Sequence, residues 1–215
     1  MVQDVGVKAR CAADHDAADR GFCGCDRQMT PRLTFHPTPL AGLMLIQRKP
    51  IADERGIFER LFCADEFAAE KIQMSVVQAN RTVTARKGTV RGMHFQHQPH
   101  AETKLVSCLA GKVFDVAVDL RRGSPTFLRW HAEELSADNY RSLLIPAGFA
   151  HGLQTLEDSC ELLYFHSAAY AADAEAGIQP TDPRVGITWP LPIAEMSTRD
   201  RSHPVVASAF EGLTP

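Results

Sequence analysis

A succession of short apolar runs, separated by turn residues, most restricts how this 215-residue chain can fold. The clearest run is 113–120, Val-Phe-Asp-Val-Ala-Val-Asp-Leu, in which residue character alternates. Ala110-Gly111-Lys112 precedes it and the turn residues of 121–125 stop it. Strands of this length, with turns about every 8–12 residues, favour an all-β sandwich or barrel over alternating strands and helices.

Other segments complete this prediction. Strands are expected at 42–47, 57–62, 76–80, 82–84, 88–95, 104–109, 127–135, 142–145, 152–155 and 160–166, and one helix at 64–71. The proline-rich tail, 171–215, is expected to wrap the barrel without adding strands to it. Residues 1–30 are rich in Ala, Asp, Gly and Cys, so we predict a disordered or spurious extension before a single domain at 31–215.

Composition excludes several classes of protein. The net charge of −3 gives no indication of a nucleic-acid surface, and no apolar run reaches the ~18 residues that a membrane span needs. The first ten residues hold no apolar segment of a secretory leader. Cys63, Cys108 and Cys160 lie among apolar neighbours, as reduced core thiols do, and Cys23-Gly24-Cys25 is too short for a paired zinc spacing. We therefore expect a cytoplasmic enzyme.

His94 is the first candidate for chemistry. If 91–96 is an extended strand, Gly92, His94 and Gln96 share one face. A histidine that faces a cavity can act as a general base near neutral pH. By itself, the same residue also fits a packed or surface histidine.

Positive charge lies near this histidine. Lys104 begins a strand and alternates with Val106 and Cys108, so it faces either solvent or an interior anionic partner. Arg55 and Arg91 would add charge that suits a phosphate or pyrophosphate, unless they are scattered surface residues.

Four more side chains allow two interpretations each. At least one of Asp115 and Asp119 is expected to be exposed, because both oppose the apolar face of their strand. Tyr164 fits either a core residue or a proton donor. His151, at the end of 146–151, resembles the second metal signature of cupin barrels. Gln96 stands where the first signature needs a histidine, so we predict no catalytic metal.

Longer motifs resemble one family, the dTDP-4-dehydrorhamnose 3,5-epimerases, over about 33–204. They are Arg55-Gly56, Gln78-Ala79-Asn80, 91–96, 104–106, 111–121, 135–137, 145–152 and 186–190. The resemblance implies a metal-free cupin jelly roll, a double-stranded β-helix with few short helices, usually as a homodimer that exchanges N-terminal strands. It also implies inversion of C3 and C5 in a nucleoside-diphosphate 4-keto-6-deoxyhexose, without a cofactor.

The resemblance also implies roles for individual residues. His94 matches the base, Asp200 the carboxylate beside it, Tyr164 the acid on the opposite face, and Lys104 the cation beside the C4 oxygen. The residues that match substrate contacts are Arg55, Gln78, Asn80, Arg91, His151, Tyr170, Glu175 and Arg199.

Some positions depart from the family pattern. Ala79 stands where an aspartate is frequent, Arg60 where a glutamate is usual, and Phe165 where a lysine is frequent. Ala169 replaces one of two paired aromatics. The alternatives are therefore a 3-epimerase or ketoisomerase on another nucleotide sugar, a non-catalytic sugar-binding cupin, and a metal-dependent cupin oxygenase.

Overall fold

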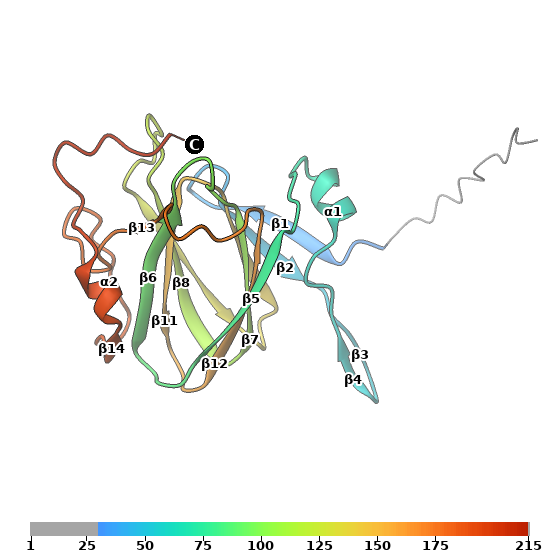
Figure 1. The fold of residues 1–215 in the computed structure, drawn as a ribbon. Helices are drawn as coiled ribbons and strands as arrows, with labels where there is room; N and C mark the ends of the chain where they lie inside the picture. The colour runs from blue at the N-terminus through green and yellow to red at the C-terminus, as the bar shows by residue number, and fades with distance from the viewer. Residues whose placement is uncertain (1–29, 215) are drawn as a thin grey trace, which may run out of the picture. The chain divides into compact units, whose positions relative to one another are not determined.

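Two mainly antiparallel sheets face each other in the computed structural model, which describes residues 30–214 (Figure 1). The first sheet has the order β1 (Leu33–Pro37), β2 (Met44–Arg48), β10 (Arg141–Ile145), β7 (Lys104–Ala110), β12 (Cys160–His166), β5 (Gln78–Thr84). The second has the order β13 (Glu175–Gly177), β6 (Thr89–Gln96), β11 (Phe149–Thr155), β8 (Lys112–Asp119), β9 (Trp130–Ser136), and β14 (Glu195–Met196) pairs with β6. β3 (Ile51–Asp53) and β4 (Gly56–Phe58) form a separate hairpin.

The main core lies between the two sheets. Val106 and Leu162 of the first sheet and Val113 and Leu153 of the second belong to one buried cluster, and each is at most 1% exposed. The two described helices, α1 (Ala64–Ala69) and α2 (Thr198–Ser202), are short. The all-β jelly roll expected from the sequence is confirmed, because successive strands from β5 to β13 pass from one sheet to the other, except for β8 and β9, which are neighbours in the second sheet.

β8 has the opposite orientation to the one that its sequence suggests. Its apolar residues Val116 and Val118 pack outward under the C-terminal tail, in a second cluster. Asp115 and Asp119 share the other face with Val113, which belongs to the core between the sheets, and both aspartates are 0% exposed. The expectation that one of them reaches solvent was wrong, because the tail supplies apolar cover for the outer face and both faces of the strand are buried.

The tail does more than wrap the second sheet, so the expectation that it adds no strand was wrong. β13 pairs antiparallel with β6, and β14 pairs parallel with the same strand. β6 would otherwise be the edge of its sheet, with unpaired backbone groups that favour another strand. Ile178 and Val206 of the tail are also buried against the sheet.

The remaining expectations concern the N-terminal part of the chain and its helices. The predicted extension at 1–30 lies, apart from Thr30, outside the described residues. β1 was not predicted from its sequence, and it pairs with β2. Helix α1 buries Phe67 in a third cluster with residues of the first sheet. No helix of the described part has the length and apolar character to cross a membrane.

Candidate active site

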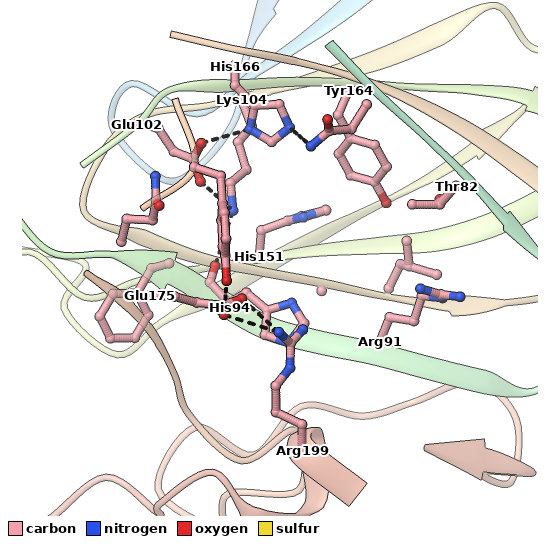
Figure 2. Close-up of a pocket in the computed structure, with 16 residues that line it drawn as sticks. Thr82, Arg91, His94, Glu102, Lys104, His151, Tyr164, His166, Glu175 and Arg199 are labelled. Carbon is pink, nitrogen blue, oxygen red and sulfur yellow. Dashed lines mark hydrogen bonds and ion pairs between the residues drawn. The ribbon is translucent and has the colours of Figure 1, made fainter. Parts of the chain in front are cut away.

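One pocket collects most of the residues that the sequence singled out (Figure 2). It is bordered by strands of both sheets and by α2 of the tail. The residues that line it are Asn80, Thr82, Arg91, His94, Phe95, Gln96, Glu102, Lys104, His151, Gly152, Leu153, Tyr164, His166, Tyr170, Glu175 and Arg199. Nine of the twelve predicted site residues are among them; Arg55, Gln78 and Asp200 are not.

A β-bulge in β6 brings Arg91 and His94 to the same pocket. His94 lies opposite His151 and Arg91 lies opposite Leu153, so two residues of β6 face the single residue Gly152 of β11. Three positions apart in a regular strand, Arg91 and His94 would point to opposite faces; the extra residue cancels that difference. The bulge residue, Gly92, has a φ of 131°, and a Cβ there would lie 2.5 Å from the Gly152 Cα.

His94 forms a pair with Asp200 of α2. Its Nε2 lies 2.8 Å from Asp200 Oδ1, and Asp200 Oδ2 accepts from the Gly92 N–H at 3.2 Å. Ser197 caps the helix, since its Oγ accepts from the Asp200 N–H at 3.0 Å. Burial alone would raise the pKa of Asp200, but the hydrogen bond and charge of His94, with the Gly92 N–H, lower it to about 2.

This pairing selects one tautomer of His94. An ionised carboxylate only accepts hydrogen bonds, so the proton of a neutral His94 resides on Nε2. Nδ1 then carries the lone pair, which is the requirement for a general base.

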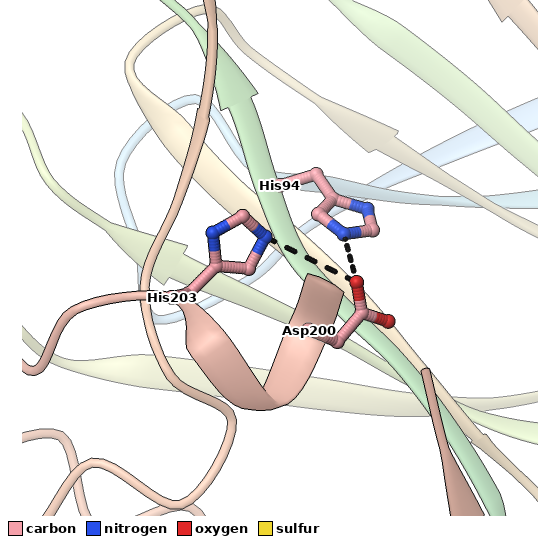
Figure 3. Close-up of side chains that lie close together, drawn as sticks. All are labelled: His94, Asp200 and His203. Atoms are coloured by element: carbon pink, nitrogen blue, oxygen red, sulfur yellow. Dashed lines mark hydrogen bonds and ion pairs between the residues drawn. The ribbon is translucent and has the colours of Figure 1, made fainter. Parts of the chain in front are cut away.

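His203, which the sequence reasoning did not select, lies next to the same pair (Figure 3). Its Nε2 is 4.0 Å from Asp200 Oδ1, and its ring centroid is 5.5 Å from that of His94. Burial, followed by the charge of His94, lowers the pKa of His203. Its position three residues after Asp200, at the end of a one-turn helix, was the signal available in the sequence.

Lys104 has the anionic partner that an inward lysine requires. Its Nζ lies 3.2 Å from Glu102 Oε1 and donates to the His94 carbonyl at 3.4 Å. Glu102 also accepts from His166 Nδ1 at 2.7 Å, and the amide of Asn80 donates to His166 Nε2 at 3.3 Å. Burial would raise the pKa of Glu102, but the hydrogen bond from His166 and the charge of Lys104 lower it. Sequence reasoning missed Glu102, although it lies two residues before Lys104.

Tyr164 belongs both to the core and to the pocket. It is 9% exposed, and its hydroxyl points toward Thr82 (Figure 2). Burial, followed by the charge of Asp115, raises the pKa of Tyr164. The phenol is therefore protonated at neutral pH and has a proton to donate.

His151 has its own carboxylate, Asp115 of β8. The His151 Nε2 lies 3.0 Å and 2.9 Å from the two oxygens of Asp115, and both side chains are buried. This contact ties His151 to the sheet.

Tyr170, Glu175 and Arg199 form the rim of the pocket. The Tyr170 hydroxyl donates to Glu175 at 2.9 Å, and Arg199 Nη1 lies 2.9 Å from the same carboxylate. Gln78 does not line the pocket; its side-chain oxygen accepts from the Tyr170 N–H at 3.0 Å and so supports the rim.

Arg55 lies apart from this pocket within the single chain. It belongs to the β3–β4 hairpin, where it pairs with Asp53 at 2.6 Å, and its side chain is 84% exposed. Ile57 and Phe58 of the same hairpin are 58% and 69% exposed.

Comparison with known proteins places this architecture in one family. The family model described as dTDP-4-dehydrorhamnose 3,5-epimerase matches residues 37–208. The chain belongs to this epimerase family. An epimerase of that name from Sinorhizobium fredii is 41% identical over 171 residues, which cover 79% of this chain and 88% of the relative.

Members of the family differ in the names they carry. A dTDP-4-dehydrorhamnose 3-epimerase from Streptomyces niveus is 36% identical over 185 residues, which cover 85% of this chain and 89% of that protein. The crystal structure of the 3,5-epimerase from Bacillus anthracis with TDP and PPi bound matches with a TM-score of 0.79 and 37% identity, over 81% of this chain and 99% of that one. The fold is therefore the cupin-type jelly roll of these epimerases, as the sequence predicted.

Proposed function

We propose that this epimerase inverts C3 and C5 of a nucleoside-diphosphate 4-keto-6-deoxyhexose, in the manner of dTDP-4-dehydro-6-deoxyglucose to dTDP-4-dehydro-L-rhamnose. The observation that carries the proposal is one pocket lined by an imidazole paired with a carboxylate, a protonated phenol and an ammonium group: His94, Tyr164 and Lys104. These are the base, the acid and the cation that an enolate mechanism needs.

The ketone at C4 makes the neighbouring hydrogens acidic. His94 Nδ1 takes the proton from C3 or C5, the electron pair forms a double bond to C4, and negative charge moves to O4. Lys104 stabilises that oxygen; one such contact typically lowers the barrier by about 2.7–4 kcal/mol. Asp200 holds the imidazole and stabilises the imidazolium.

Tyr164 completes the inversion by giving its proton to the opposite face of the same carbon. The enolate then returns to the ketone, and exchange with water resets the base and the acid. Removal and return on opposite faces are essential, because a proton that returns to its original face changes nothing.

The rim residues suit the nucleotide. Arg91 and Arg199 offer guanidinium groups to a pyrophosphate, and His151 offers a further hydrogen-bonding group. Tyr170, 55% exposed beside Glu175, is placed to stack on the base. No step of this mechanism calls for a metal or redox cofactor, and the free thiols Cys63, Cys108 and Cys160 fit a cytoplasmic enzyme.

The test is hydrogen exchange with dTDP-4-keto-6-deoxyglucose in heavy water, followed by NMR at C3 and C5. The wild type should exchange and invert both positions, and His94→Ala should abolish exchange. The exposed His36→Ala is the matched control and should behave as wild type. Exchange retained in His94→Ala would refute the assignment of the base.

A 3-epimerase is the second candidate, because a relative that is 36% identical to this chain carries that name. Inversion at C3 alone, or a product with a moved ketone, would favour the 3-epimerase or the ketoisomerase respectively.

Arg55 supports a homodimer in which each chain completes the pocket of the other. Ile57 and Phe58 are apolar and exposed next to Arg55, and such a surface favours burial against a partner. Arg55 itself does not line the pocket of its own chain. Sedimentation should therefore give twice the chain mass.

Mixing Arg55→Ala with His94→Ala tests that arrangement directly. If Arg55 acts across the interface, a mixed dimer contains one pocket with both His94 and Arg55, and activity returns. If Arg55 acts within its own chain, mixing restores nothing.

A further inference from the structure

His203 holds a buried nitrogen with no partner. Its Nε2 is one of four buried side-chain polar atoms in the described residues that have no hydrogen bond. An orphaned buried donor or acceptor costs about 1–3 kcal/mol. The atom faces Asp200 (Figure 3), and the ring is packed so tightly that a Cβ on Gly177 would lie 2.5 Å from the same Nε2.

Together with its neighbours, this nitrogen forms a set of metal-binding groups. The potential ligand atoms of His94, Asp200 and His203 all lie within 4.8 Å of one another. Two imidazole nitrogens and one carboxylate oxygen are a ligand set that zinc and related divalent metals accept, with a position left for water.

The distances are close to those of a bound ion. Metal–ligand bonds of about 2.0–2.1 Å in a tetrahedron place donor atoms roughly 3.3 Å apart. His94 Nε2 and Asp200 Oδ1 are 2.8 Å apart, and His203 Nε2 is 4.0 Å from that oxygen. Side-chain shifts of under about 1 Å would therefore bring these donor atoms to the separations that they have around one bound ion.

We propose that His94, Asp200 and His203 form an inhibitory site for a divalent transition metal such as zinc. The site is separate from the metal signature of cupin barrels, in which His151 would take part; here His151 is engaged by Asp115. Metal binding is independent of the proposed function, whereas inhibition rests on it.

The inhibition follows from the tautomer of His94. A neutral imidazole has one N–H and one lone pair. When Asp200 accepts from Nε2, the lone pair is on Nδ1 and is available to the substrate. When a metal takes the Nε2 lone pair, the single proton resides on Nδ1, and the ring no longer has a basic site. Asp200 changes at the same time from hydrogen-bond acceptor to metal ligand.

Arg199 opposes the metal. Its Nη2 lies 3.4 Å from His94 Nε2, and its Nε lies 3.6 Å from Asp200 Oδ1, so its positive charge repels a cation. The side chain is 55% exposed and pairs with Glu175, which leaves it room to turn toward solvent. Arg199→Met should therefore tighten metal binding, and this distinguishes the site from exposed histidines elsewhere.

The binding experiment uses the full chain after treatment with a chelator and its removal. Thiols bind zinc tightly, so all variants carry serine at Cys11, Cys23, Cys25 and the partly buried Cys63, whereas Cys108 and Cys160 are buried. Calorimetry with Zn²⁺ and the visible spectrum of Co²⁺ should show one site per chain. His203→Asn should weaken binding at least about tenfold, since the loss of even an outer-shell partner costs 10–100-fold. His36→Asn is the matched control and should leave binding unchanged.

Activity provides the second arm. Zinc should inhibit solvent exchange by the parent, and His203→Asn should retain exchange while losing sensitivity to zinc. His203→Gln replaces it if the asparagine variant unfolds. No metal bound by the parent, or equal affinity in the His203 variants, would overturn the proposal. Metal bound in the predicted pattern by a protein with no exchange activity would instead refute the proposed function and leave the site standing.

Discussion

Two histidine–aspartate pairs face the same pocket, and they differ in how the fold holds them. His94 and His151 are directly opposed on neighbouring strands, β6 and β11. His151 takes its aspartate, Asp115, from the adjacent strand β8 of the same sheet, whereas His94 takes Asp200 from a five-residue helix more than a hundred positions away.

The difference fits the separate roles proposed for the two histidines, with His94 as the base and His151 as a substrate contact. The His151 side chain is 6% exposed and contacts both oxygens of Asp115, so its position is fixed. The His94 side chain is 24% exposed and contacts one oxygen of Asp200, while the other is held by the Gly92 N–H. An imidazole that changes its protonation during a reaction benefits from a carboxylate that orients it and stays ionised.

The largest expected effect is that of Asp200→Asn. The amide no longer fixes the Nε2–H tautomer or stabilises the imidazolium, so kcat for solvent exchange should fall by about 10²–10⁴-fold. Exchange at saturating substrate in heavy water measures it, with thermal unfolding as a check on the fold. A fall in kcat of equal size in Asp115→Asn would show that the two histidine–aspartate pairs do not have separate roles.

Asp115→Asn should act on stability and binding. It exchanges a buried carboxylate for an amide against His151, and disruption of a buried hydrogen-bonded pair costs about 1–3 kcal/mol. Urea denaturation should show that loss, and KM should rise by a larger factor than kcat falls. Unchanged stability would show that the sheet does not depend on this pair.

Low pH should weaken the His94–Asp200 pair over a defined pH range. The folded pKa of Asp200, about 2, lies below its ordinary value of 3.8, so its stabilisation is complete above that ordinary value and is lost as pH falls toward about 2. The shift corresponds to about 2 kcal/mol. The pKa of Asp119 is also about 2, so the contribution of Asp200 is the difference between wild type and Asp200→Asn. Urea unfolding at about pH 5 and about pH 2.5 measures this contribution. If the free energy of unfolding falls by the same amount between these pH values in wild type and in Asp200→Asn, the assignment is contradicted.

Local patterns predicted most of the strands. The run at 160–166 matches β12 from end to end, because regular alternation between turns leaves little choice. The same patterns failed for β8: alternation shows that a strand has two faces but does not tell which is the interior. They also missed β14, whose two residues join β6 because that edge offers unpaired backbone groups.

The candidate site also combines residues that sequence motifs identified with residues that only the structure revealed. His94, Tyr164 and Lys104 came from motifs, and they line one pocket as expected. Asp115 and Glu102 were not selected as partners, because partnership depends on which strands are adjacent. Arg55 was expected at the pocket, yet it lies on an exposed hairpin within its own chain.

By itself, the sequence determined the all-β architecture, the family and the residue types available for proton transfer, since turns, alternation and motif spacing are local properties. The tertiary structure alone decided that a bulge at Gly92 directs Arg91 and His94 to one side, that Asp115 is buried beneath His151, and that His203 stands beside Asp200. These depend on strand register and on how the tail returns to the sheet, which are set by contacts between residues that are distant in the chain.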